Sequence, residues 1–266
     1  MTKQLAVFTF IGTISLVLLI ILNISFGSSF ISPTTWLFSF FDGDTDFNEI
    51  FWQFRLPRAI TCVVAGAGLA VGGLMMQTLF RNPLAGPDVL GLSSGASLMV
   101  ALVLMLGLAN KFFYALATNT WGLALAATMG SAVVFSLVMV LAQIIRDNTS
   151  LLLVGVMVSA ATSSVVGVVQ FISQASDLQL FLIWSLGNVG GTNWQEITVL
   201  AVLLLVGMCI YIRQIKALNG HLLGESYAES LGINTKQSRL WIVLGTSILT
   251  GGITAFCGPI AFVGLA

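Results

Sequence analysis

The sequence predicts an all-α membrane protein that crosses the bilayer several times. Of its 266 residues, 57% are hydrophobic and only 8% are charged, which leaves too little polar surface to cover a water-soluble fold. Uncharged apolar runs of about twenty residues, the length that spans a hydrocarbon core, recur along the chain. The formal net charge is zero, which argues against a nucleic-acid partner that binds through a basic patch.

The apolar runs predict where the transmembrane helices lie within a single membrane domain, residues 1–266. Seven runs are long enough to span the membrane, near residues 5–26, 59–80, 89–108, 121–145, 150–172, 196–213 and 239–257. We expect another span to start at residue 259. Because this last run stops at Ala266, it is too short to cross the bilayer, and we expect the sequence to be a truncated protein.

The positive charges of the short loops predict the orientation of these helices. With the N-terminus in the cytoplasm, the inner loops hold Lys3, Arg81, Arg146, Arg213, Lys216, Lys236 and Arg239, and the outer side holds Arg55, Arg58 and Lys111. This excess of basic residues on one side favours a cytoplasmic N-terminus.

The second predicted span carries Gly68 and Gly72 in a small-xxx-small spacing, with further glycines nearby. Such residues let helix backbones approach closely. The spacing fits either tight packing within one subunit or a seam between two subunits, and both alternatives stay open.

Two segments outside the spans have a pattern of their own. Residues 173–195 are too polar for a span, and their apolar residues predict a short interfacial or re-entrant helix on the outer side. In the cytoplasmic segment 213–239, Leu223, Tyr227 and Leu231 recur every four residues and form one apolar stripe. We expect this stripe to pack on the membrane domain, on the lipid interface or on a soluble partner. The single histidine, His221, is expected to face solvent.

The sequence carries few residues or motifs suited to ion coupling, ATP binding or metal binding. No ionisable residue falls inside a predicted span, which disfavours a proton-coupled carrier, and no GxxxxGK[ST] loop is present to bind ATP. The acidic loop at residues 42–46 has Phe47 and Gln53 where a calcium loop needs Gly and Glu. We therefore expect no enzyme active site, no metal and no cofactor bound by this chain. After these exclusions, the class of protein that fits the sequence is a channel or carrier without its own energy source.

Several motifs resemble one family over essentially the whole chain. These are RLPR (55–58), RNPLAGPDVLG (81–91), SSGA (93–96), GESYAESLG (224–232) and GPIAFVGL (258–265). They resemble the FecCD-type permeases, the vitamin B12, haem and iron-siderophore importers of the ATP-binding-cassette (ABC) class. The resemblance implies a type II ABC importer permease fold in which seven to eight of ten transmembrane helices are present and the C-terminus is truncated.

The resemblance also implies roles for particular residues. Arg55 and Arg58 would receive carboxylates of a substrate-binding protein, although both fit interfacial snorkelling arginines as well. The cytoplasmic gate would consist of Asn82, Pro83, Leu84, Asn148 and Thr149, of which Asn82-Pro83 also fits an ordinary turn. The ATPase coupling segment would consist of Leu223, Gly224, Glu225, Tyr227, Ala228, Leu231 and Gly232.

The function implied is that of a permease subunit in the bacterial inner membrane. It would move an iron-siderophore-type chelate, or cobalamin or haem, by ATP-driven alternating access. Its partners would be an ABC ATPase that carries the ATP and Mg, a periplasmic or lipid-tethered substrate-binding protein, and a second permease copy. The alternative is a secondary transporter or channel that needs no ATPase.

Overall fold

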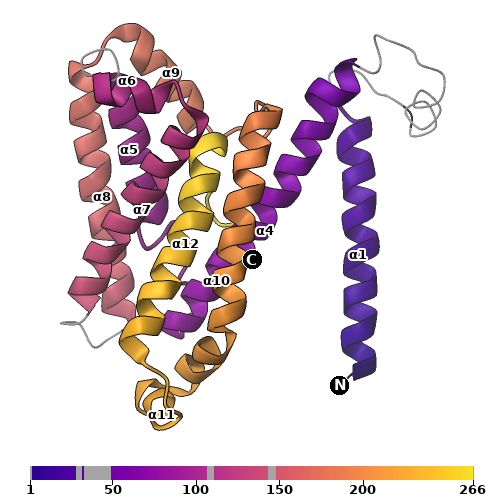
Figure 1. The fold of residues 1–266 in the computed structure, drawn as a ribbon, viewed down its shortest axis with the longest axis vertical. Helices are drawn as coiled ribbons and strands as arrows, with labels where there is room; N and C mark the ends of the chain where they lie inside the picture. The colour runs from indigo at the N-terminus through magenta and orange to yellow at the C-terminus, as the bar shows by residue number, and fades with distance from the viewer. Residues whose placement is uncertain (1, 28–31, 33–48, 107–110, 143–147, 266) are drawn as a thin grey trace.

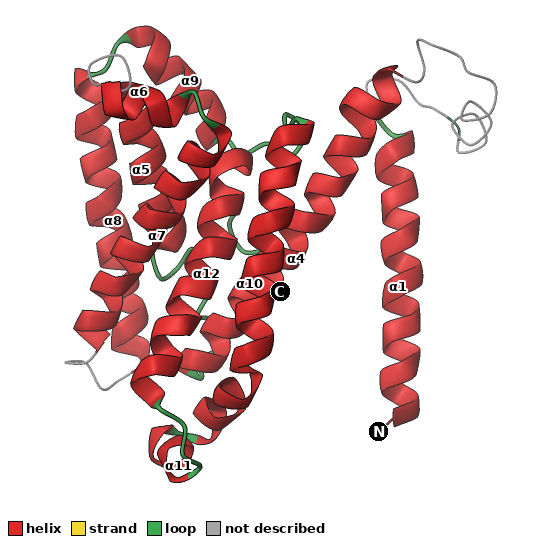
Figure 2. Cartoon of the chain, viewed as in Figure 1, coloured by secondary structure: helices red, strands yellow, loops and turns green. Residues whose placement is uncertain are grey.

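The computed structural model describes residues 2–27, 32, 49–106, 111–142 and 148–265, and all regular structure within them is helical (Figure 2). The elements are α1 (Thr2–Ser25), the π-helix η1 (Phe51–Arg55), α4 (Leu56–Phe80), α5 (Leu92–Leu106), α6 (Lys111–Ala117), α7 (Thr120–Ala142), α8 (Asn148–Ile172), α9 (Ala175–Ser185), α10 (Trp194–Leu223), α11 (Glu225–Ser230) and α12 (Thr235–Cys257). The predicted all-α membrane fold is confirmed.

Among the described residues, six helical stretches are long and apolar enough to cross a membrane: Ala6–Ser25, Phe51–Phe80, Thr120–Leu141, Leu153–Ile172, Trp194–Leu223 and Thr235–Cys257. Together with the shorter helix α5 they run alternately up and down the bundle, and α1 stands apart from the other helices along most of its length (Figure 1). The helix at the predicted span 89–108 is shorter, because α5 begins only at Leu92 and residues 81–91 are turns.

Helix α12 is the centre of the bundle. In its most apolar stretch 72% of the residues are buried, against 22% for α10 and 6% for α1. Its glycines allow close contacts: a Cβ added at Gly251 would lie 2.8 Å from the Cα of Thr128 in α7. The largest core cluster joins α12 to α4, α5, α7 and α10 through side chains such as Ile242, Met75 and Phe135.

Gly68 and Gly72 of α4 pack within the chain. A Cβ at Gly68 would lie 2.6 Å from Cδ1 of Ile253, and one at Gly72 would lie 3.3 Å from Oγ1 of Thr250. Both neighbours belong to α12. Of the two alternatives for this spacing, the structure therefore shows packing within one subunit.

Residues 258–265 are turns, where the sequence predicts the start of another span at 259. Gly258 ends α12 with φ of 71°, a backbone conformation that favours glycine, and Pro259 follows it. The chain then turns back toward the interior and lies against the middle of α4, where Gly264 approaches Leu69 and Pro87.

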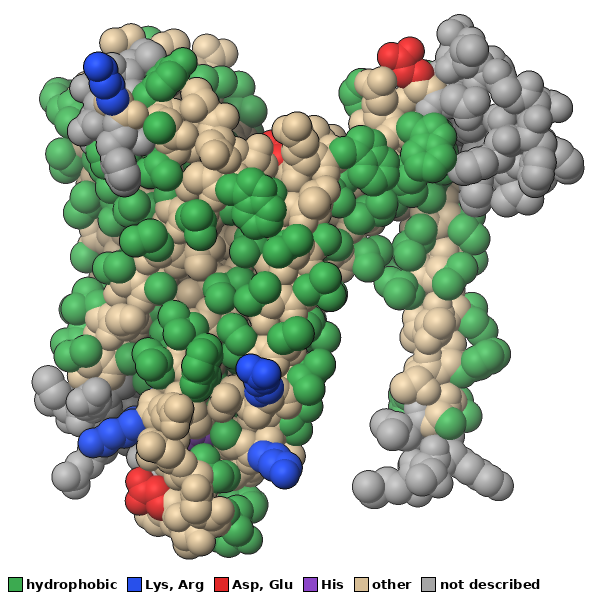
Figure 3. All heavy atoms as spheres, in the orientation of Figure 1, with side chains coloured by type: hydrophobic (Ala, Val, Ile, Leu, Met, Phe, Trp, Pro, Cys, Tyr) green, Lys and Arg blue, Asp and Glu red, His purple; other side chains and the backbone are tan. Residues whose placement is uncertain are grey.

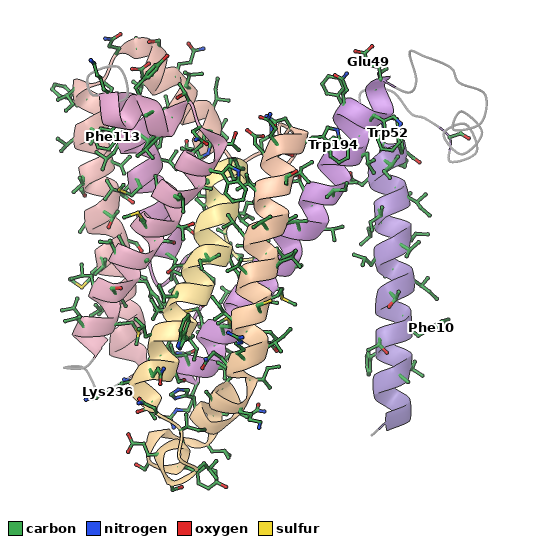
Figure 4. The ribbon with its side chains drawn as sticks, viewed as in Figure 1. Phe10, Glu49, Trp52, Phe113, Trp194 and Lys236 are labelled. Carbon is green, nitrogen blue, oxygen red and sulfur yellow. The ribbon has the colours of Figure 1, made fainter. Side chains whose placement is uncertain are left out.

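The two ends of the bundle differ in charge as the predicted orientation requires. The end with α11 also holds the described basic residues Arg81, Arg213, Lys216, Lys236 and Arg239, and Lys and Arg side chains gather there in Figure 3. Figure 4 places Lys236 at this end, and Glu49, Trp52 and Trp194 at the other. Because positive residues concentrate on the cytoplasmic side, the α11 end is the inner end.

The outer end carries the short helix predicted within residues 173–195. This helix, α9, buries Phe181, and Trp184 donates a hydrogen bond from Nε1 to the carbonyl of Ala255 (2.9 Å). A second tryptophan, Trp194, donates from Nε1 to the carbonyl of Trp52 (3.0 Å) and so joins α10 to η1. Tryptophans at this level are typical of a membrane–water interface.

Candidate transport and coupling sites

The two predicted docking arginines lie inside a helix, because this helix begins more than two turns earlier than the sequence predicts. In the described part of the chain, this helical structure begins at Glu49 instead of residue 59, and it passes Pro57 by way of a π-turn. The N–H of Leu56 bonds to the carbonyl of Phe51, five residues back. Because proline has no N–H to donate, this wider turn lets the helix continue through it.

Arg55 is buried, with 6% of its surface exposed. Its Nη1 donates to the carbonyl oxygens of Ile24 (2.7 Å) and Ser25 (3.1 Å), the last residues of α1. Gly27 makes room for it, since a Cβ there would lie 2.6 Å from the guanidinium carbon. A cation at this position satisfies carbonyls that the end of a helix leaves unpaired.

Arg58 is exposed, and its stem passes Gly190 in the turn before α10. It presents a cation on the outer end of the bundle, where a soluble protein would contact the permease. For Arg55 to bind a partner's carboxylate, it would first have to exchange its bonds to α1. The docking prediction therefore now depends on Arg58.

The predicted gate residues after α4 form a tight polar turn. Arg81 ends the helix in the left-handed conformation (φ 48°), and the side chain of Asn82 accepts a bond from the N–H of Leu84 (2.9 Å). Gln77 donates from Nε2 to the carbonyl of Pro83 (3.0 Å). Leu84 is 64% exposed, so this turn presents an apolar side chain at the inner end.

The other predicted gate residues, Asn148 and Thr149, open helix α8, and their side chains lie outside the described part of the structure. Helix α8 packs against the segment that carries the first gate turn: a Cβ at Gly155 would lie 2.8 Å from the carbonyl oxygen of Val89. The two predicted gate segments thus belong to elements in contact.

The coupling segment is anchored on one side and exposed on the other. Ala228 is fully buried and packs near Gly220 of α10, and the N–H of Ile233 bonds to its carbonyl (3.0 Å). Gly224 and Gly232, with φ of 114° and 76°, make the turns at either end of α11. Leu223, Tyr227 and Leu231 are 65%, 49% and 57% exposed. The apolar stripe is therefore not packed on the membrane domain, which leaves lipid or a soluble partner to cover it.

His221 does not face solvent as predicted. Helix α10 continues to Leu223 instead of ending near residue 213, so His221 lies in its last turn. The side chain is 2% exposed, and its Nε2 pairs with the hydroxyl of Ser238 (2.8 Å) at the start of α12. This buried bond joins the end of α10 to the start of α12, and the coupling segment connects these two helix ends.

The sequence reasoning missed Asp88. It lies between two apolar runs in a segment interpreted as an inner turn. The structure turns this segment inward, and Oδ2 of Asp88 accepts a hydrogen bond from the N–H of Phe262 (2.8 Å). The available signal was Gly-Pro-Asp, three residues that disfavour helix, placed well before the next helix begins.

The described residues hold no group of three or more His, Cys, Asp or Glu side chains that could bind a metal ion. The acidic loop at residues 42–46 lies outside the described part of the chain. The three cysteines, Cys62, Cys209 and Cys257, are free thiols.

Together the apolar bundle, its basic inner end and its exposed coupling segment define a multi-pass helical membrane permease. The chain belongs to the FecCD transport family, which it matches over residues 15–266. It is a bacterial inner-membrane permease of the ABC transporter class.

Several relatives with known cargo are similar to the chain. The hemin transport permease HmuU of Yersinia pestis is 36% identical over 227 residues, which is 84% of this chain and 67% of the relative. The vitamin B12 import permease BtuC of Pectobacterium atrosepticum is 34% identical and the Fe(3+)-citrate import permease YfmE of Bacillus subtilis 32% identical, each over 94% of this chain; they are covered over 71% and 73% of their own lengths.

A solved structure has the same fold. An inward-facing metal-chelate type ABC transporter superposes with a TM-score of 0.74 at 26% identity, over 95% of this chain and 76% of that one.

Proposed function

We propose that the chain is the membrane-spanning subunit of an ABC importer for an iron-siderophore-type chelate, with haem or cobalamin as the related cargo. Relatives that carry haem, vitamin B12 and ferric citrate support this cargo class. These molecules have in common a metal held by a bulky organic ligand. Transport proceeds by alternating access, in which the helices open first to the outer side and then to the cytoplasm.

The single observation that supports an external energy source is the exposed stripe of the coupling segment. Leu223, Tyr227 and Leu231 present apolar surface at the inner end, while the buried Ala228 packs against α10 near Gly220. An amphipathic segment of this kind is suited to dock in an apolar groove of a soluble partner. The partner we propose is an ATPase that binds ATP and Mg, contacted also by Gly224, Glu225 and Gly232.

On the outer side we propose that a substrate-binding protein delivers the chelate and docks through carboxylates on Arg58. A guanidinium binds a carboxylate in a fixed two-bond geometry, and Arg58 is exposed at this end. A second permease copy completes the pathway. On the inner side, the turn at Asn82, Pro83 and Leu84 and the start of α8 at Asn148 and Thr149 close it.

The test is uptake of a radiolabelled ferric chelate into vesicles that contain the full-length permease and its ATPase, with the binding protein outside. We expect uptake to require both ATP in the vesicle lumen and the binding protein. An ATPase variant that binds but does not hydrolyse ATP is the control and should abolish sustained uptake. Uptake driven by a proton gradient in vesicles without the ATPase would overturn the proposal.

A further inference from the structure

Two non-helical segments far apart in the sequence meet inside the bundle. The first is residues 81–91, between α4 and α5, and the second is residues 258–265, after α12. The N–H of Phe262 donates to Oδ2 of Asp88 (2.8 Å) across 174 positions of sequence. Gln77 donates from Nε2 to the carbonyl of Leu265 (3.2 Å). We refer to these two hydrogen bonds and the residues that make them as the junction.

Beside the junction, the backbones of α4 and segment 258–265 are too close for a side chain larger than that of glycine at positions 73 and 264. A Cβ at Gly264 would lie 3.0 Å from both the carbonyl oxygen of Leu69 and the Cδ of Pro87, and a Cβ at Gly73 would overlap the carbonyl oxygen of Gly264. The contact is therefore a packed seam between three pieces of chain, with the two hydrogen bonds at its edge.

The junction lies at membrane depth. Gly73 stands seven residues before Phe80, the last residue of α4, which places it about 10 Å from the inner end of that helix at a rise of about 1.5 Å per residue. Pro87 and Gly264 pack at this level. Asp88 follows Pro87 directly, so it is a carboxylate within the hydrocarbon layer.

A carboxylate at this depth is costly to keep and needs partners. Irregular backbone is tolerated in a membrane only where its polar groups are satisfied. Phe262 has φ of 68°, a conformation that is unfavourable for a residue with a Cβ. The bond from its N–H to Asp88 holds this residue in place and satisfies a donor that lipid would leave unpaired.

The junction also reaches the predicted gate. The same Nε2 of Gln77 that donates to Leu265 donates to the carbonyl of Pro83. The amide of Gln77 thus joins the gate turn to segment 258–265 at Leu265. Asp88 holds the same segment at Phe262. Beyond the anchored backbone, Phe262 and Val263 are 71% and 41% exposed.

We propose that Asp88 is a positioning residue of the transport cycle: it ties segment 258–265 to the gate-bearing segment 81–91, so that both move as one body when the permease changes state. The inference rests on the proposed function. It adds an intramembrane residue that acts through a hydrogen bond to backbone and does not contact the cargo.

The first experiment compares Asp88→Asn with Asp88→Ala in the assembled full-length transporter in vesicles. Asn keeps an oxygen that accepts the N–H of Phe262, whereas Ala removes it. We expect uptake by Asp88→Asn within about twofold of the unmodified protein, and a loss of about tenfold or more for Asp88→Ala, since Ala removes the acceptor that ties segment 258–265 to segment 81–91. Thr162→Val is the matched control: it removes a buried hydroxyl that bonds only within α8, and it should leave uptake unchanged.

The second experiment reports movement and does not depend on uptake. Val263→Cys, in a background with the three native cysteines replaced by alanine, is labelled with a water-soluble maleimide with and without ATP. We expect the labelling rate to depend on nucleotide with Asp or Asn at position 88, and to lose that dependence with Ala.

The outcomes separate the inference from the proposed function. If the unmodified transporter shows neither ATP-driven uptake nor nucleotide-dependent labelling, the proposed function fails, whereas a failure confined to the variants at position 88 counts against the inference alone. Full uptake by Asp88→Ala, or an Asp88→Asn protein that inserts normally but has lost nucleotide-dependent labelling, overturns the role of Asp88. If Asp88→Ala does not insert, Asp88→Asn alone decides by the same two measurements.

Discussion

Arg55 shows how one side chain can end one helix and attach it to the next. Its Nη1 donates to the carbonyls of Ile24 and Ser25, at the end of α1, where a helix leaves carbonyls without intrahelical partners. An interior position for an arginine is favourable only when its donors are satisfied in this way. The RLPR sequence therefore combines a structural arginine with an exposed one, Arg58.

Arg58→Glu is expected to weaken docking of the substrate-binding protein about tenfold, mainly through slower association, because an exposed charge chiefly steers the encounter. Its thermal stability should stay unchanged, since Arg58 is exposed. The measurement is surface plasmon resonance of the full-length permease in nanodiscs at two salt concentrations. Arg58→Lys is the control and should retain part of the affinity. Unchanged docking by Arg58→Glu would assign Arg58 to membrane snorkelling instead.

Gly73→Ala is expected to destabilise the permease by ~1–3 kcal/mol, because its methyl group would overlap the backbone of Gly264 and overpacking costs this much. Gly66→Ala, in the same helix, meets nothing within 4 Å and should be neutral or stabilising by up to ~1 kcal/mol through helix propensity. Thermal unfolding in detergent compares the two. Equal melting temperatures would contradict the close approach described here.

At the residue scale, the sequence could predict exposure where a pattern repeats, but not where a single side chain finds a distant partner. Leu223, Tyr227 and Leu231 were recognisable by their spacing. His221 was placed in solvent because its partner, Ser238, comes from another helix. Asp88 escaped notice for the same reason: its partner, Phe262, lies 174 positions away.

At the element scale, the end of α10 was predicted too early because charged residues were interpreted as the end of a helix. Helix α10 passes Arg213 and Lys216 and ends at Leu223, because the break is made by Gly224 and a lysine or arginine does not stop a helix. Long basic side chains reach the interface from inside such a helix. The start of the second span was misplaced by Pro57, which a π-turn accommodates.

The coupling segment supplies the prediction at this scale. Leu231→Asp is expected to reduce ATPase binding by at least about tenfold, because a charge would have to enter an apolar groove. Co-purification of the ATPase with the full-length permease, quantified by mass, is the measurement. Leu186→Asp, at a leucine exposed at the outer end (84%, against 57% for Leu231), is the matched control and should bind normally. Normal binding by Leu231→Asp would mean that lipid covers the stripe.

At the scale of the whole molecule, composition was enough to predict the fold class, since few charges and long apolar runs fit only a helical membrane protein. Composition did not reveal that α12 is the central helix. Its polar and small residues lower its hydropathy, yet 72% of its apolar stretch is buried. Within a membrane, burial follows from small residues and close packing more than from hydrophobicity.

The placement of α1 has a mechanical consequence. Residues 6–19 are all exposed, and its buried contacts, Ile24 with Phe51 and Ala59, lie near its outer end. Because α1 is held only near its outer end, the exposed stretch 6–19 can tilt while the contacts around Ile24 stay in place. Because bilayer thickness sets how far a helix must lean, a change in thickness is expected to alter the tilt of α1.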